Sequence, residues 1–377
     1  MDVLSITITR PMPYQVVQRF GYDPAKAYAN YPGGPCLGHG AMKVSGTISG
    51  IEADRPKGKL EARILLLQDA FGTAFDWIPV DADWTEAMFN ATVAVPAGGW
   101  YRLELRYTDG MSNASISSAV EPVGVGEVFV IAGQSYAENC NDEILRIEDP
   151  EGRISALDPI SGEWRIANDP QPGVLERNDN DTRLKGSIWP AAMNGLLSLI
   201  RVPIGMVNVA VGATASRQWL PGERLYENLV NAGETAGPFR GLLWQQGESD
   251  VIESTSTDVY KSRILSIKSS LEDKLGFSFT WLPAKSTFHP TAYIKPEEEG
   301  WIRSAINELW SMPGFGPGPD TDILGGIGLH RADKLHSEHF TLLGQQQAGL
   351  LWCISIWNML QSVEKHTSLH TSEDFLK

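Results

Sequence analysis

From residue 126 onward, short apolar runs alternate with segments of helical periodicity, and this alternation continues to residue 360. Unbroken β-branched runs are typical of strands buried on both faces, whereas apolar residues three and four apart indicate amphipathic helices. An α/β domain is therefore predicted, with a parallel sheet covered on both faces and a ligand crevice at the carboxyl ends of the strands. The pattern predicts strands over 128–131, 204–211, 241–245, 277–282 and 323–329, and helices over 190–200, 260–275, 296–309 and 343–360.

The first 122 residues follow a different period. Apolar and polar residues alternate over 4–9 and 101–107, and 60–67 and 91–95 are further strand candidates, separated by Gly, Pro and Asp. Many short strands with turn residues between them indicate a β-sandwich of about 120 residues. We therefore expect a β-sandwich accessory domain over 1–122, an α/β domain over 123–361 and a polar C-terminal tail over 362–377.

The chain is acidic, with a formal net charge of -15 at pH 7. This charge disfavours nucleic acid or an anionic membrane surface as the main partner. A membrane span is also not expected, because the sequence contains no run of about 18 apolar residues. The first residues, MDVLSITITR, show no signal peptide pattern. A secreted, a phage-associated and a cytoplasmic location all remain open, as does the oligomeric state.

The three cysteines, Cys36, Cys140 and Cys353, are far apart in the sequence. Their spacing matches neither a disulfide framework nor a zinc site, so buried free thiols are expected. The histidines are equally scattered. The sequence therefore predicts neither a metal site nor a cofactor.

Ser135 follows the predicted strand 128–131 directly, in the sequence Gly133-Gln134-Ser135. A serine at the end of a buried strand sits on a sharp turn with its hydroxyl exposed, which is what a nucleophilic serine needs. Ser135 could equally cap a following helix.

Three other strand ends carry polar groups that complete a hydrolytic site. The second strand ends at Gly212-Ala213-Thr214, with Trp219 soon after, and the third runs into WQQGESD over 244–250. The last predicted strand, over 323–329, is followed by Asp333 and His336. A doubly wound sheet brings these ends to one edge, where a serine, an oxyanion hole and an Asp–His pair would have to meet.

These four blocks resemble the SGNH hydrolase superfamily: GQS after a strand, GAT with a following tryptophan, WQQGESD, and D-x-x-H. The sialate O-acetylesterase and acetylxylan-esterase-like branch is the most similar, and its members often carry an extra β-domain. The resemblance covers residues 126–360. It implies an α/β/α sandwich and a metal-independent serine esterase, without cofactor, that removes O-acetyl groups from an acetylated carbohydrate.

The resemblance assigns the triad residue by residue. Ser135 is the expected nucleophile, His336 its general base and Asp333 the carboxylate that orients the imidazole. This fits the chemistry, because a serine hydroxyl becomes nucleophilic only when an imidazole of fixed tautomer takes its proton. His339 and His330 are alternative bases, and Asp333 could instead be a solvated loop acid.

The expected oxyanion donors are the backbone N–H groups of Ser135 and Gly212 and the side chain of Gln246. Gly212 could instead only permit a turn, and Gln246 could be a buried structural amide. Substrate contacts are expected from four residues of the same blocks: Gln134, Tyr136, Trp219 and Glu248.

Two positions depart from the family pattern. Tyr136 stands where the family commonly has Asn, and Ser249 stands where other branches place an oxyanion-hole Asn. Because Ser249 has no side-chain amide, the role of amide donor to the oxyanion is assigned to Gln246 instead. Glu248 and Asp250 could also be taken for the acid pair of a glycosidase, but two acids this close after a strand more often bind loop amides.

Two other functions remain open at this point. One is a non-catalytic carbohydrate-binding or adhesin-type protein with a degenerate esterase domain, in which the β-sandwich could also contact sugar. The other is a lipase or thioesterase of the same superfamily, which needs an apolar acyl pocket. The polar segment 142–185 favours a sugar substrate.

Overall fold

The structure is a computed structural model that describes residues 4–27, 37–50, 58–112, 114–174, 185–332 and 339–362. The chain divides into two compact units. The first comprises Met1–Glu127 and Ile200–Gly205, and the second comprises Val128–Leu199 and Met206–Ser362. The long strand β9 (Ser115–Gly133) runs from the first unit into the second.

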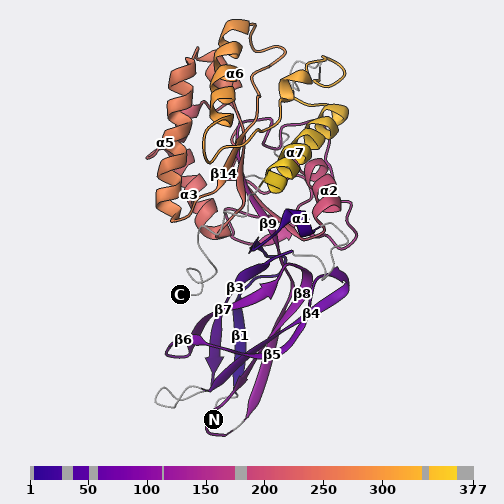
Figure 1. Cartoon of the computed structure of the whole chain (residues 1–377), viewed down its shortest axis with the longest axis vertical. Coiled ribbons are helices and arrows are strands. Elements are labelled where there is room, and N and C mark those ends of the chain that lie inside the picture. Colours follow the sequence, from indigo (N-terminus) through magenta and orange to yellow (C-terminus); the bar gives the residue numbers. More distant parts are fainter. Residues whose placement is uncertain are drawn as a thin grey trace. The chain divides into compact units, whose positions relative to one another are not determined.

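The first unit is built mostly from antiparallel strand pairs, whereas β2 pairs parallel with β9 (Figure 1). Strand β3 pairs with β1, β2 and β7, and β7 pairs with β6. Strand β4 pairs with β5 and β8, and β8 pairs with the first part of β9. The elements before β9 are β1 (Ser5–Arg10), β2 (Val16–Phe20), α1 (Pro24–Ala27), β3 (His39–Ser49), β4 (Lys59–Phe71), β5 (Phe75–Val80), β6 (Ala82–Thr85), β7 (Met88–Pro96) and β8 (Gly98–Thr108). The strands predicted over 4–9, 60–67, 91–95 and 101–107 fall on β1, β4, β7 and β8.

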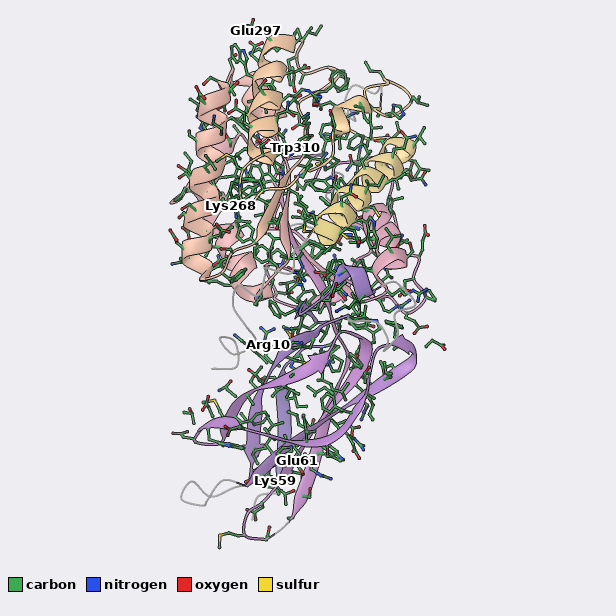
Figure 2. The ribbon with its side chains drawn as sticks, in the orientation of Figure 1. Arg10, Lys59, Glu61, Lys268, Glu297 and Trp310 are labelled. Carbon is green, nitrogen blue, oxygen red and sulfur yellow. The ribbon has the colours of Figure 1, made fainter. Side chains whose placement is uncertain are left out.

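Period-two patterning explains the two faces of β8. Tyr101, Leu103, Leu105 and Tyr107 are buried, whereas Arg102, Glu104 and Arg106 between them point outward. The outward residues form ion pairs with neighbouring strands, such as Arg63–Glu104 and Arg106–Glu61, and Glu61 also pairs with Lys59 (Figure 2). Partly exposed pairs of this kind contribute about 1 kcal/mol or less each, so burial of the apolar face dominates.

The second unit has a central sheet in the order β14-β13-β9-β12-β10-β11. Strands β9, β13 and β14 run parallel, and β10 and β11 form an antiparallel pair. Its elements after β9 are β10 (Ile154–Leu157), β11 (Trp164–Ile166), α2 (Trp189–Ile200), β12 (Ile204–Asn208), η1 (Ser216–Trp219), α3 (Arg224–Ala236), β13 (Gly241–Gln245), α4 (Glu248–Ile252), α5 (Thr257–Leu275), β14 (Thr280–Pro283), α6 (Pro296–Trp310), η2 (Thr321–Ile323) and α7 (Leu342–Ser362).

Helices cover both faces of this sheet, with α3, α5 and α6 on one side and α2 and α7 on the other (Figure 1). On the second side, the rings of Trp189 and Trp352 pack 5.4 Å apart. On the first side, the Trp310 indole N–H at the end of α6 donates to the Pro283 carbonyl, 2.8 Å away (Figure 2). The alternation of strands and helices thus gives the mixed α/β fold that the sequence predicts.

The predicted strand over 323–329 is wrong. Thr321–Ile323 is a short 3-10 helix, and the following residues form a turn in which Gly326 accepts hydrogen bonds from the His330 and Arg331 N–H groups. Ile323, Ile327 and Leu329 are 65%, 56% and 55% exposed. The apolar run therefore does not mark a buried strand, because most of its side chains face solvent.

Other boundaries also differ from the prediction, and the strand predicted over 204–211 ends already at Asn208, as β12. The strand predicted over 277–282 begins only at Thr280, as β14. The polar segment 142–185, for which no strand is predicted, contains the small hairpin of β10 and β11. Asp169 anchors this segment, since its carboxylate accepts hydrogen bonds from the Leu145 and Ser187 N–H groups at 3.1 and 2.8 Å.

Candidate active site

Three of the four predicted blocks meet at the carboxyl edge of the sheet in the second unit. Strands β9 and β13 end side by side, with Gly133 opposite Gln245, and the Gln134 N–H donates to the Gln245 carbonyl at 3.0 Å. The Val211 N–H donates to the Gly133 carbonyl at 3.0 Å, which brings Gly212 to the same edge. Parallel strands position their following loops in this way because their carboxyl ends share one edge.

Ser135 lies in the turn that follows β9. The Ala137 N–H donates to the Gln134 carbonyl, and the Glu138 N–H is shared between the carbonyls of Gln134 and Ser135. Gly133 is needed immediately before this turn, because it has a φ of 132° and a Cβ there would lie 2.1 Å from the Gln245 carbonyl oxygen. Ser135 is 9% exposed, so its side chain is mostly enclosed by the site.

Glu138 contacts the second block directly. The Gly212 N–H donates to the Glu138 carboxylate at 2.7 Å, and the Cys140 thiol donates to the same oxygen at 3.8 Å. A Cβ on Gly212 would stand 3.1 Å from that oxygen and 3.6 Å from the Ser135 Cβ. Sequence reasoning missed Glu138, because a carboxylate three residues after a serine carries no signal until the fold brings Gly212 next to it.

The Gln246 amide is fully buried and already occupied. Its Nε2 group lies within hydrogen-bond distance of Asp250 Oδ2 at 2.7 Å, the Thr214 carbonyl at 3.1 Å and Gln134 Oε1 at 3.3 Å. Three acceptors already surround the two hydrogens of this group. In this geometry the Gln246 amide ties the loops of the site together, and its expected role as an oxyanion donor stays a prediction.

Asp250 connects the second block to the third. Its carboxylate accepts hydrogen bonds from the Ser216 N–H and hydroxyl, both at 2.7 Å, and from Gln246. Arg263 from α5 pairs with it at 3.2 Å. Asp250 is completely buried, so these donors compensate for the lost hydration of its charge.

Glu248 lies at the start of α4 and is 1% exposed. Its Oε1 accepts a hydrogen bond from the Ser286 hydroxyl at 2.6 Å, and its Oε2 has no hydrogen-bond partner within the described ranges. Burial raises the pKa of Glu248 to about 8, so this carboxyl is protonated at neutral pH. Its predicted contact with substrate would thus be made by a neutral carboxyl group.

Tyr136 is the central ring of an aromatic and cationic cluster and is fully buried. The Arg331 guanidinium stacks 4.2 Å from the ring centroid, and the rings of Phe340 and His339 pack 4.8 and 5.0 Å away. Burial, reinforced by nearby positive charges that include Arg331, lowers the pKa of His339 to about 3. His339 is therefore neutral at physiological pH and lies against the residue that follows Ser135.

Four predicted site residues remain, and the structure describes two of them, Gln134 and Trp219. Gln134 is 3% exposed, and its Oε1 accepts a hydrogen bond from the Ser249 N–H at 3.2 Å. Trp219 is fully buried against Trp244, with its indole N–H bonded to the Thr214 hydroxyl, so this geometry gives no support to a substrate contact. Asp333 and His336 lie outside the described residues.

Metal-binding groups do not cluster in the part of the chain that the structure describes. Nowhere in it do three or more His, Cys, Asp or Glu residues come together so that they could hold a metal ion. Of the three cysteines, Cys353 is buried with a free thiol as expected, Cys140 is half-buried with its thiol on the Glu138 carboxylate, and Cys36 lies outside the described residues.

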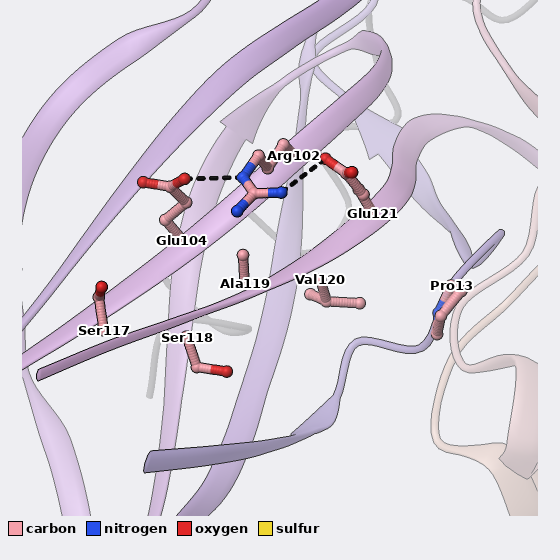
Figure 3. A pocket seen from close by; sticks show the side chains of 8 residues that line it. All are labelled: Pro13, Arg102, Glu104, Ser117, Ser118, Ala119, Val120 and Glu121. Atoms are coloured by element: carbon pink, nitrogen blue, oxygen red, sulfur yellow. Dashed lines mark hydrogen bonds and ion pairs between the residues drawn. The ribbon is translucent and has the colours of Figure 1, made fainter. Parts of the chain in front are cut away.

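Two surface cavities lie in the first unit. One, of about 490 Å³, is lined by Pro13 and by residues of β8 and β9, and its Arg102 is held between Glu104 and Glu121 (Figure 3). The other, of about 790 Å³, is lined by residues of β1, β3, β5, β6 and β7. Neither includes a residue of the four blocks. In the described ranges, no helix is long and apolar enough for a membrane span.

The similarity of this chain to known proteins agrees with the family resemblance of the four sequence blocks. Residues 125–283 match the family described as carbohydrate esterase, sialic acid-specific acetylesterase. A probable carbohydrate esterase of Arabidopsis thaliana is 26% identical over 170 residues, which are 41% of this chain and 64% of the plant protein. The chain thus spans less than two thirds of this relative's length. The predicted resemblance is confirmed by the family match.

A solved structure shows that the fold is shared. A carbohydrate acetylesterase from Xanthomonas citri has a TM-score of 0.56 and 15% sequence identity to this chain. The similarity covers 92% of this chain and 73% of that one.

Proposed function

We propose that this chain, whose residues 125–283 match the sialic acid-specific acetylesterase family of carbohydrate esterases, is a serine esterase that removes O-acetyl groups from a glycan. The observation that carries the proposal is the meeting of Ser135 with Gly212 at the carboxyl edge of the sheet. The family match and the likeness to the carbohydrate acetylesterase of Xanthomonas citri support the choice of an acetylated sugar.

In the proposed mechanism, the Ser135 hydroxyl attacks the acetyl carbonyl while His336, oriented by Asp333, takes its proton. The oxyanion of the tetrahedral intermediate is held by the N–H groups of Ser135 and Gly212. Collapse of this intermediate expels the sugar hydroxyl, which receives the proton from His336, and leaves an acetyl group on Ser135. Water, deprotonated by His336, then releases acetate and restores the serine. The reaction needs no metal or cofactor.

The other parts of the proposal concern binding and organisation. Gln134, Tyr136 and Glu248 shape the wall behind the nucleophile, and Gln246 supports that wall through Gln134 and Asp250. The mostly antiparallel strand pairs of the first unit support a β-sandwich accessory domain over residues 1–122.

The decisive experiment replaces the nucleophile. Ser135→Ala is expected to lower acetate release by at least about a thousandfold, because no acyl-enzyme can form. Ser262→Ala, which removes an exposed hydroxyl from α5, is the matched control and should retain full activity. Turnover of acetylated xylan, acetylated sialosides and 4-nitrophenyl esters of increasing chain length should be measured, with circular dichroism to verify folding.

Near-native turnover by Ser135→Ala would refute the nucleophile. A preference for long acyl chains would instead indicate a lipase or thioesterase. Binding of glycans without acetate release by the unaltered chain would indicate the non-catalytic alternative.

A further inference from the structure

We propose that Glu138 determines specificity in this site, because its carboxylate holds the Gly212 N–H until a hydroxyl group of the glycan substrate draws it away. This inference rests on the proposed function, since it assumes that the oxyanion forms at Ser135. It adds a residue that the four blocks do not contain.

The first step of the argument is the position of the carboxylate. The Gly212 N–H donates to Glu138 Oε2 at 2.7 Å, so the backbone donor expected to bind the oxyanion is occupied when no substrate is present. The Cβ position of Gly212 is 3.1 Å from this oxygen and 3.6 Å from the Ser135 Cβ. The carboxylate and the serine therefore lie against the same face of Gly212.

The second step is a conflict of charge. A single N–H cannot serve both a carboxylate and a developing oxyanion, and two negative charges within hydrogen-bond reach of one donor repel each other strongly in an enclosed site. Glu138 is 8% exposed, so solvent screens this repulsion poorly. Hydrolysis therefore requires the carboxylate to leave Gly212.

The third step shows that Glu138 is not needed to hold the loop. The Val211 N–H is fixed to Gly133, and the Thr214 hydroxyl donates to the Val211 carbonyl at 2.8 Å. Further on, Ser216 is held by two hydrogen bonds to Asp250. Because these contacts fix the chain on both sides of Gly212, removing the Glu138 carboxylate frees the N–H without moving it.

The last step identifies what replaces the lost hydrogen bond. A carboxylate that gives up a backbone N–H in an enclosed site is compensated best by a new donor, because a lost charge-assisted hydrogen bond is costly. A sugar hydroxyl next to the acetyl ester supplies that donor, whereas an aryl acetate has none. The chain should therefore favour acetylated sugars with a free neighbouring hydroxyl over simple esters.

The test compares two substrates across three variants. We would measure kcat/KM for mono-O-acetylated xylobiose and for 4-nitrophenyl acetate with Glu138→Ala, Glu138→Gln and the control Glu143→Ala. Glu143 is an exposed acid on the same segment, and its hydrogen bonds to Gln345 are made by its backbone. The control thus removes the same charge nearby without touching Gly212.

Glu138→Ala is expected to raise kcat/KM for 4-nitrophenyl acetate roughly tenfold and to lower the preference for the sugar ester by at least about tenfold. Glu138→Gln should fall in between, because its amide oxygen still accepts from Gly212 but carries no charge. Glu143→Ala should leave both values unchanged. An unchanged preference in both Glu138 variants, or an equal loss on both substrates, would overturn the proposal.

A double variant separates this proposal from the proposed function. If Ser135→Ala abolishes activity in both backgrounds but the Glu138 variants keep the original preference, only the role of Glu138 is wrong. If the Ser135→Ala/Glu138→Ala variant still hydrolyses both esters, the serine mechanism itself fails. The Glu138→Gln variant preserves the hydrogen bond to Gly212, so it keeps the test valid if the alanine variant does not fold.

Discussion

His339 is a histidine whose protonation the fold opposes strongly. It packs on Tyr136, and the charged groups that act on it in the described part of the chain, including His289 and Arg331, all disfavour the imidazolium form. Its pKa falls to about 3, below the ordinary value of 6.5. As the pH drops below about 6.5, the unfolded chain therefore takes up a proton that the folded chain does not, and this group lowers the stability progressively until about pH 3.

The variant His339→Gln removes that penalty. Relative to the unaltered chain, we expect it to gain about 2 kcal/mol between pH 7 and pH 5, because the proton is then no longer taken up on unfolding. Urea unfolding at the two pH values measures the difference. Equal pH dependence of both proteins would show that His339 titrates normally in the folded state.

A companion variant, His336→Gln, addresses the catalytic base. It is expected to lose both turnover and the pH dependence of turnover near neutral pH, while His339→Gln keeps that pH dependence. Turnover of 4-nitrophenyl acetate from pH 5 to 9 measures both. The reverse pattern would transfer the role of base to His339.

At the scale of elements, Asp250 joins α4 to η1 and α5. Its buried carboxylate holds Ser216 after the second block and pairs with Arg263. Removing it leaves several buried donors without an acceptor. We therefore expect Asp250→Ala to lower the free energy of unfolding by about 3 kcal/mol and to reduce esterase activity, although Asp250 makes no proposed contact with the substrate.

The matched control is Asp258→Ala. The Asp258 side chain is 91% exposed and contacts only Lys261 among the pairs found in the described residues, at 3.5 Å. Its loss should change the stability by less than about 0.5 kcal/mol. Similar urea midpoints for the two variants would show that Asp250 does not connect these elements.

At the scale of the whole molecule, activity is expected to be independent of metal ions. Histidine and cysteine are scattered along the sequence, and the described residues bring no metal-binding cluster together. After dialysis against EDTA, acetate release should stay within about twofold of its original value. A loss that zinc or another divalent ion restores would contradict the serine mechanism.

The sequence alone determined the elements whose signal is local. Periodicity placed α2, α5, α6, α7 and β13 to within a few residues, because a buried face repeats along a helix or strand whatever it packs on. The same reasoning failed over 323–329, where an apolar run is exposed. The nucleophile candidate Ser135 was also accessible from sequence, because a strand followed by GQS is a local pattern.

Only the tertiary structure decided how the polar groups share their partners. Gln246 carried an amide that the sequence could assign equally well to an oxyanion or to the protein interior, and the fold surrounded it with Asp250, Thr214 and Gln134. Glu138 reached Gly212 across 74 positions of sequence. Hydrogen bonds and pKa values depend on distances between segments remote in the chain, and these distances are set by packing rather than by any local pattern.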